Sequence, residues 1–164
     1  MIIVLKGGWS AEREVSLASG KICAQALRDC GHDGQELDAR ESVVTDLPHF
    51  SPEIVFNALH GGWGENGTVQ GLLESLSIPY THSGVVSSFN AMNKIISKKI
   101  FIKNKIKTPK FFSISKSEYK KKKIQKIIRN KKIKFPIVLK PVNEGSSLGV
   151  NICENKERLS KSSR

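Results

Sequence analysis

The sequence predicts an α/β protein in which an open parallel-sheet domain precedes a smaller α+β subdomain. Residues 2–5 (IIVL) are continuously apolar, which is typical of a strand buried on both faces of a parallel sheet. Residues 53–59 form a second such run, and a glycine-rich turn and a helix-forming segment follow each of them. Strand, glycine turn and helix in repetition indicate an open α/β sheet.

Periodicity and turn residues predict the remaining elements in order. We expect a first helix over residues 15–27, in which Val15, Ala18, Ile22 and Ala26 recur at helical spacing and form the buried face. Four further helices are predicted, over residues 68–76, 85–92, 94–104 and 117–130. Short strands are predicted near residues 35–37, 78–81, 111–115 and 137–140.

Charge and composition change near residue 93. Residues 1–93 contain 5 Lys and Arg against 11 Asp and Glu, whereas residues 94–164 contain 22 against 4. We therefore predict one domain over residues 1–93 and a second over residues 94–164.

The basic second half leaves two interpretations open. It could form a nucleic-acid or polyanion-binding surface. However, the same half is rich in Ile and Asn, which share A/T-rich codons with Lys, and its few aromatic residues have spacings typical of core positions. These features favour a solvated basic face, and we expect no nucleic-acid partner.

The sequence shows no signal for export or membrane insertion. The N-terminal apolar run is too short for a signal peptide and lacks a basic segment before it. The longest uncharged stretch, residues 75–93, is interrupted by Pro79 and is rich in polar residues, so it should not span a membrane. Three cysteines without a CxxC pair suit a reducing compartment. We expect a cytoplasmic protein.

A first candidate site lies in residues 7–16 (GGWSAEREVS), which follow the first predicted strand. Open parallel sheets bind ligands at the carboxyl ends of their strands. A carboxylate placed there could hold a substrate ammonium group through a charge-assisted hydrogen bond. Alternatively, the acidic residues only complement the dipole of the following helix.

A second candidate is the segment that follows the strand at residues 53–59. Residues 62–67 (GWGENG) match the GxGxxG pattern of dinucleotide sites, but no acidic residue lies between Glu74 and Glu118 to hold a ribose. The glycines could instead let backbone N–H groups and His60 approach an anionic or carbonyl-bearing substrate. From spacing alone, His60 could equally be a strand-end histidine satisfied by its neighbours.

The third candidate, residues 140–150 (KPVNEGSSLGV), is the most specific segment of the chain. A predicted strand ends in a lysine, and the following loop contains two serines and two glycines that could surround phosphate oxygens. It is not a Walker A loop, because no Gly-Lys-Ser/Thr ends it. Taken alone, it could be a solvent-exposed turn.

Together these segments resemble the D-alanine–D-alanine ligases of the ATP-grasp superfamily. The resemblance rests on residues 7–16, 58–71 and 140–149, and residues 79–84 and 92–94 fit between them in order. It covers the whole chain. It implies that residues 1–93 form the substrate-binding domain that precedes the ATP-grasp domain, and that residues 94–164 are the first part of the latter.

The resemblance also implies a reaction and a first substrate site. The family joins two D-alanines into D-alanyl-D-alanine for peptidoglycan synthesis, with ATP as the phosphoryl donor and an acyl phosphate as the intermediate. By this resemblance, Glu12 anchors the ammonium group of the first D-alanine, and His60 lines the same subsite.

By the same resemblance, the second half supplies the groups that handle ATP and the second D-alanine. Lys94 and Lys140 would hold the phosphates of ATP. Ser146 would orient or deprotonate the second D-alanine, and Ser147 would contact both the substrate and ATP. Lysines and a glycine-serine loop suit phosphoryl transfer, which depends mainly on positioning and on stabilising spread-out negative charge.

The chain departs from the family pattern at several places. Asn66 stands where an aspartate is common, and Asn143 stands where an arginine is frequent, which would weaken contacts across the loop. The chain ends at Arg164, before the segments that in the family grip adenine and bind Mg²⁺. We therefore expect Mg²⁺ and a homodimer for the full-length enzyme, with the metal ligands outside this chain, and no activity from this chain alone.

Two alternatives to this function stay open. The first is another ATP-grasp carboxylate–amine ligase, including a D-alanine–D-lactate ligase. The second is the basic polyanion-binding domain considered above.

Overall fold

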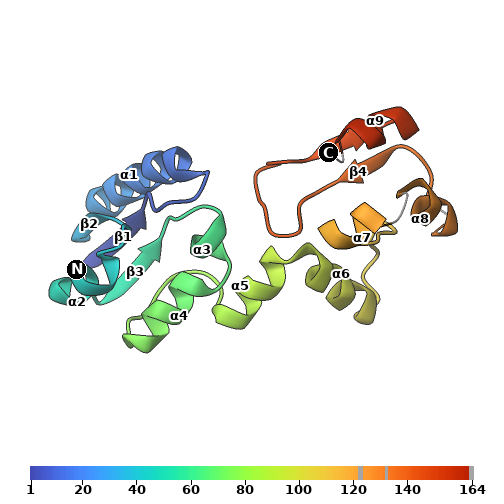
Figure 1. Ribbon diagram of the computed structural model, residues 1–164. Coiled ribbons are helices and arrows are strands. Elements are labelled where there is room, and N and C mark those ends of the chain that lie inside the picture. The colour runs from blue at the N-terminus through green and yellow to red at the C-terminus, as the bar shows by residue number, and fades with distance from the viewer. Residues whose placement is uncertain (122–123, 132, 163–164) are drawn as a thin grey trace. The chain divides into compact units, whose positions relative to one another are not determined.

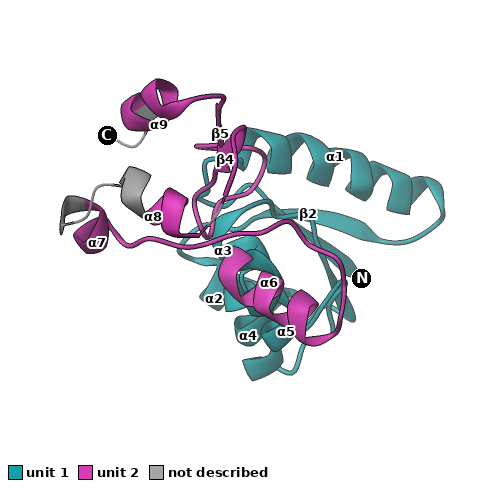
Figure 2. Cartoon of the chain, turned by 90° about the vertical axis from the view of Figure 1, so that its right-hand side faces the viewer, with its two compact units in different colours: residues 1–93 teal, residues 94–164 magenta. Residues whose placement is uncertain are grey.

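The computed structural model describes residues 1–121, 124–131 and 133–162. The chain divides into two compact units, Met1–Asn93 and Lys94–Arg164, which Figure 2 shows in different colours. Each unit has its own hydrophobic core, and each is described by itself.

A three-stranded parallel sheet forms the centre of unit 1 (Figure 1). Its strands are β1 (Ile2–Lys6), β2 (Gly34–Asp38) and β3 (Ile54–Asn57), in the order β2-β1-β3. The central strand is fully buried at Ile3, Val4 and Leu5. These facts confirm the predicted open parallel sheet and its buried first strand, because a strand covered on both faces is apolar throughout.

Helices cover both faces of this sheet. They are α1 (Arg13–Asp29), α2 (Val43–Phe50), α3 (Gly62–Glu65), α4 (Thr68–Ser75) and α5 (Val85–Met92). α1 lies on one face, where Val4 packs with Ala24, and α2 and α4 lie on the other, where Ile3 and Leu5 pack with Leu47 and Leu73 (Figure 1). The alternation of side chains along β1 thus divides the core into two layers.

The buried face of α1 is not the face that its apolar periodicity predicts. Val15 and Ile22 are 57% and 70% exposed, whereas the buried positions are Ser16, Gly20 and Ala24. A Cβ atom at Gly20 would overlap the Cβ of Lys6 on β1. Small residues at every fourth position let the helix approach the strand closely, so the prediction of the buried face was wrong.

Two predicted strands are also absent from the structure. Residues 78–81 make a single parallel bridge, between Val55 and Tyr80, and residues 111–115 are irregular. In contrast, α2 and the one-turn helix α3 were not predicted. α3 contains two glycines in four residues, a composition that disfavours helix and therefore gave no signal.

Unit 2 contains four helices and a two-stranded antiparallel sheet among its described residues. The helices are α6 (Lys94–Lys103), α7 (Lys116–Lys121), α8 (Ile124–Asn130) and α9 (Lys156–Ser162), and the strands are β4 (Ile137–Leu139) and β5 (Asn151–Cys153). Residues 122–123 of the predicted helix 117–130 lie outside the described residues. The core of this unit is built from Ile128, Ile137, Cys153 and Leu159. Over the described residues of both units, no helix is long and apolar enough to cross a membrane.

The close contact between α1 and β1 leads to a first testable expectation. Gly20→Ala should lower the free energy of unfolding by about 1–3 kcal/mol, because the new methyl group meets the rigid stem of Lys6. Gly71→Ala in α4 is the matched control, since its Cβ would have only an ordinary contact at 3.9 Å, with Val85. That control should raise stability by roughly 0.5–1 kcal/mol through helix propensity. Urea unfolding measures both, and equal effects of the two substitutions would contradict the packing argument.

Candidate functional site

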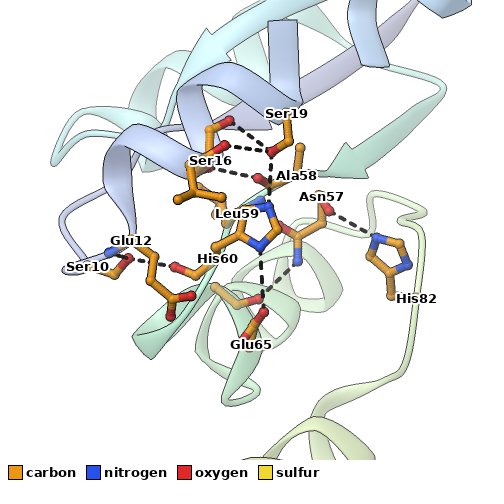
Figure 3. A network of polar contacts seen from close by, with 12 residues as sticks. Ser10, Glu12, Ser16, Ser19, Asn57, Ala58, Leu59, His60, Glu65 and His82 are labelled. Atoms are coloured by element: carbon orange, nitrogen blue, oxygen red, sulfur yellow. Dashed lines mark hydrogen bonds and ion pairs between the residues drawn. The ribbon is translucent and has the colours of Figure 1, made fainter. Parts of the chain in front are cut away.

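The turns that follow β1 and β3 meet at one edge of the sheet in unit 1. Because the strands are parallel, their carboxyl ends lie at the same edge. Ser10, in the first turn, donates a hydrogen bond from its Oγ to the backbone oxygen of His60 at 2.6 Å (Figure 3). The same Oγ accepts one from the backbone N–H of Glu12 at 3.1 Å. One serine therefore fixes both turns.

The carboxylate of Glu12 lies directly against Gly61. A Cβ atom at residue 61 would overlap Oε2 of Glu12, and Gly61 has a φ of +67°. Only glycine satisfies both conditions at low cost, since other residues rarely adopt this φ. The glycine thus allows the Glu12 carboxylate to lie beside the turn that carries His60 (Figure 3).

The imidazole ring of His60 lies between α1 and α3. Its Nε2 is 2.9 Å from Oγ of Ser19, in α1. Its Nδ1 is 4.0 Å from Oε1 of Glu65, in α3. Both ring nitrogens thus face a polar side chain, and the ring orientation is set by two different helices (Figure 3).

A buried hydroxyl joins the ends of β1 and β3. Oγ of Ser16 accepts a hydrogen bond from the backbone N–H of Gly7 at 2.8 Å and donates one to the backbone oxygen of Ala58 at 2.7 Å. Ser16 is fully buried in the face of α1 that packs on the sheet. The helix therefore holds both turns in register with each other.

An ion pair between Arg13 and Asp38 also fixes the Gly7-Gly8 turn. Arg13 contacts Asp38 through two nitrogens, at 2.9 and 2.5 Å, and donates to the backbone oxygen of Gly8 at 2.6 Å. The hydrogen bond from Arg13 holds the pKa of Asp38 well below its usual value, although partial burial of the carboxylate acts in the opposite direction. Arg40 adds a third contact to Asp38 at 3.0 Å. Asp38 was not among the predicted site residues, although its place at the end of β2 puts it at the same sheet edge.

Polar side chains also hold the segment that contains α3. Nδ2 of Asn57 and Nε2 of Gln70 both donate to the backbone oxygen of Gly64 at 3.0 Å. Oδ1 of Asn66 accepts a hydrogen bond from the backbone N–H of Thr68 at 3.0 Å, at the start of α4. An aspartate oxygen could make the same bond, so this contact does not depend on which of the two residues stands at position 66.

Two stacked tryptophans, Trp9 and Trp63, link the turn after β1 to α3. The rings of Trp9 and Trp63 stack at a centroid distance of 4.5 Å with an interplanar angle of 10°. Such aromatic pairs contribute about 0.5–1.5 kcal/mol beyond their buried area. This contact connects the turn after β1 to α3.

The candidate phosphate-binding residues all lie in unit 2. Lys140 follows β4, and Ser146 and Ser147 lie in the loop between β4 and β5, all three exposed to solvent. Nζ of Lys94, at the start of α6, donates a hydrogen bond to the backbone oxygen of Glu144 in this loop. The backbone N–H of Lys94 donates to the backbone oxygen of Val142 at 3.1 Å. These two hydrogen bonds connect the start of α6 to the predicted phosphate-binding loop.

The structure therefore brings the predicted site residues together in two sets. Glu12 and His60 lie on adjoining turns of unit 1, and the remaining predicted residues (Lys94, Lys140, Ser146 and Ser147) lie in unit 2. The residues that hold the first set, chiefly Ser19 and Asp38, were not predicted from the sequence. Ser19 gave no signal there, because its partner His60 lies 41 residues away in the chain.

Comparison with protein families matches both units. Residues 30–83 match the family model described as "D-ala D-ala ligase N-terminus", and residues 100–163 match the model described as "D-ala D-ala ligase C-terminus".

Individual relatives and solved structures agree with this match. A D-alanine–D-alanine ligase of Pelagibacter ubique is 48% identical over 159 residues, which are 96% of this chain and 51% of that protein. A ligase of the same name from Wolbachia pipientis is 46% identical over 156 residues, which are 95% of this chain and 47% of that protein. The crystal structure of the Bacillus anthracis D-alanine–D-alanine ligase aligns over 98% of this chain and 51% of its own, with a TM-score of 0.80 and 36% identity. The chain spans about half the length of the curated relatives it matches.

The Arg13–Asp38 pair gives a pH-dependent expectation. Asp38→Asn should lower the free energy of unfolding at about pH 7 by roughly 1–3 kcal/mol, as expected for losing hydrogen bonds to a charged group. Because the pKa of Asp38 is lowered by folding, its contribution is present above the ordinary aspartate pKa and is lost as the pH falls toward the folded value. The difference between variant and parent should therefore shrink between about pH 5 and about pH 3 in urea unfolding.

The exposed Glu41, three residues along the chain, provides the control for this measurement. Glu41→Gln should change stability by less than about 0.5 kcal/mol at either pH. A difference between Asp38→Asn and the parent that stays constant with pH would contradict a role for the ionised carboxylate.

Proposed function

Because the chain belongs to the D-alanine–D-alanine ligase family, we propose that it forms the substrate-binding and first ATP-handling parts of an enzyme that makes D-alanyl-D-alanine. Residues 1–93 would be the substrate-binding domain and residues 94–164 the first part of the ATP-grasp domain. The observation that carries the proposal is the carboxylate of Glu12 lying against Gly61, beside His60, at the ligand-binding edge of a parallel sheet.

The first D-alanine would bind at this edge through its ammonium group. Glu12 can accept a charge-assisted hydrogen bond from the ammonium, which is stronger than one between neutral groups. His60 would line the same subsite, with its ring held by Ser19 and Glu65. A site whose side chains are held before substrate arrives loses less entropy when it binds.

The carboxylate of this D-alanine would then be phosphorylated. One of its oxygens attacks the γ-phosphorus of ATP, the bond between that phosphorus and the β,γ-bridging oxygen breaks, and ADP leaves an acyl phosphate behind. Lys94, Lys140 and Ser147 would bind the ATP phosphates, with the lysines supplying positive charge to the transferring group. The hydrogen bond between Lys94 and Glu144 supports placing this lysine at the loop.

The second D-alanine would complete the reaction by attacking the acyl carbon with its amine. A carbon–nitrogen bond forms, the carbon–oxygen bond to phosphate breaks, and inorganic phosphate leaves. The attacking nitrogen must also lose a proton, and Ser146 would orient the amine or relay this proton, while Ser147 would help to bind the substrate. Both serines lie in the loop that follows Lys140, so the phosphate and the attacking amine would be held near one another.

Mg²⁺ is expected for this reaction because it neutralises phosphate charge. In the part of the chain that the structure describes, no group of three or more His, Cys, Asp or Glu residues is placed to hold a metal ion. No step is therefore assigned to a metal here. From the family resemblance we also propose a cytoplasmic, homodimeric enzyme of peptidoglycan synthesis, with no membrane or nucleic-acid partner.

The function is tested in a fusion of residues 1–164 to the part of the Pelagibacter ubique ligase that this chain does not match. The fusion should release ADP in the presence of ATP and D-alanine and should form the dipeptide. Glu12→Gln should lower kcat/KM for D-alanine on the order of 10- to 100-fold, as expected for losing a hydrogen bond to a charge.

Glu14→Gln is the matched control, because Glu14 is exposed in the first turn of α1, two residues away. It should leave kcat/KM within about twofold. Equal losses in the two variants would rule out Glu12 as the anchor of the ammonium group.

Supplying D-lactate with D-alanine in the same assay tests the rival D-alanine–D-lactate ligase, since that enzyme would form an ester product.

Lys140→Met provides an independent test of the second unit. Removing the ammonium should lower kcat/KM for ATP on the order of 10- to 100-fold, because charge stabilisation of the transferring phosphoryl group is lost. Lys134→Met, at an exposed position in the same unit, should change this constant by less than about twofold. The readout is ADP release at varied ATP, and unchanged kinetics in Lys140→Met would remove this lysine from the proposed ATP site.

A further inference from the structure

The loop that carries Ser146 and Ser147 is tied to the start of α6 through Lys94. The family resemblance assigns the ammonium of Lys94 to the phosphates of ATP. We infer that Lys94 is in addition a positioning residue, whose ammonium holds the backbone of the loop at Glu144 and thereby sets where the two serines lie. The inference deepens the proposed function and rests on it for the roles of these serines.

Lys94 contacts the first part of the loop at two points. Its backbone N–H donates a hydrogen bond to the backbone oxygen of Val142 at 3.1 Å, and its Nζ donates one to the backbone oxygen of Glu144. A hydrogen bond from a charged donor is stronger than one between neutral groups. Because the main chain and the side chain of one residue make these contacts, the loop cannot move away from the start of α6 without breaking them.

The loop needs support because its two serines adopt an unfavourable backbone conformation. Ser146 and Ser147 have φ values of +45° and +60°, in the left-handed region that residues other than glycine rarely adopt. Such conformations persist only where the surrounding contacts hold them. A hydrogen bond from the backbone N–H of Leu148 to the backbone oxygen of Gly145, at 2.9 Å, closes the loop on itself. The bond from Lys94 instead anchors the loop to a helix.

The ammonium of Lys94 can hold the loop and a phosphate at the same time. It has three N–H donors, and one of them is directed to Glu144, so two stay available. Phosphate oxygens bound to these two donors would fix the ammonium and, through it, the loop. ATP binding would thereby help to place Ser146 and Ser147 for the second D-alanine.

Cleavage by a glutamate-specific endoprotease tests the contact on the chain of residues 1–164. Glu144 is exposed, and the carbonyl of the bond that the protease would cut is the one that Lys94 holds. Lys94→Met removes the donor and should speed cleavage after Glu144 about threefold to tenfold, because the released loop enters the protease more often. Cleavage after Glu154, which is exposed beyond β5, should not change and is the internal reference.

Lys98→Met is the matched control in the same helix. Nζ of Lys98 contacts Oγ1 of Thr108 at 2.8 Å and the backbone oxygen of Pro109 at 2.9 Å, away from the loop. This variant should leave cleavage after Glu144 within about twofold of the parent. Lys94→Arg should also stay within about twofold, because a guanidinium can donate to the same carbonyl oxygen.

The yield of dipeptide per ADP in the fusion described above tests the link to the serines. With the loop misplaced, water would attack the acyl carbon of the acyl phosphate and break its bond to phosphate, which gives back D-alanine and inorganic phosphate. Lys94→Met should therefore lower the dipeptide formed per ADP released by about twofold or more. Lys140→Met should slow both products and keep their ratio. A lysine that only binds phosphate would likewise leave the ratio unchanged.

The inference is overturned by unchanged cleavage after Glu144 in Lys94→Met, by an equal increase in Lys98→Met, by an increase that persists in Lys94→Arg, or by an unchanged ratio of dipeptide to ADP. Circular dichroism checks that each variant is folded. If Lys94→Met does not fold, Lys94→Gln, which is shorter and uncharged, takes its place with the same expectation. The cleavage results need no catalysis, so they decide the inference even if the fusion makes no dipeptide, an outcome that would count against the proposed function instead.

Discussion

The close packing of α1 on β1 determines the geometry of the site in unit 1. It requires a glycine at position 20, because Lys6 occupies the space into which any side chain there would extend. With the helix at this distance, Ser16 reaches the turns after both β1 and β3 and bonds to each. One turn further, Ser19 reaches His60. A larger separation between helix and strand would remove all three hydrogen bonds together.

Hydrogen bonds between side chains and the backbone fix the conformation of these turns. Ser10 bonds to the backbone at His60 and Glu12, and Arg13 bonds to the backbone at Gly8 while it pairs with Asp38. Two of these contacts, Ser10 to His60 and Arg13 to Asp38, join residues from different strands or turns. The arrangement explains how a carboxylate on one turn and an imidazole on another are held at fixed positions with little regular secondary structure around them.

The sequence predicted those features that depend on local pattern. The buried strand at Ile2–Lys6, the glycine-rich turns and α5 at Val85–Met92 follow from runs and spacings. The roles that the family motifs suggest for Glu12 and His60 stay predictions. The buried face of α1 was predicted wrongly because hydrophobic periodicity takes no account of how close a strand must approach. Ser19 and Asp38 were missed for a related reason, since their partners lie 41 and 25 residues away in the chain.

The contacts of Ser19 also bear on how His60 holds its proton. The hydroxyl of Ser19 has a single hydrogen, and its Oγ lies 2.9 Å from the backbone oxygen of Val15 as well as 2.9 Å from Nε2 of His60. The Val15 oxygen can only accept, so a hydroxyl that donates to it must accept from the ring. Both contacts are then satisfied only when Nε2 of His60 carries a proton. α1 therefore selects the tautomer of His60 as well as the orientation of its ring, and both consequences follow from the distance at which Gly20 sets the helix.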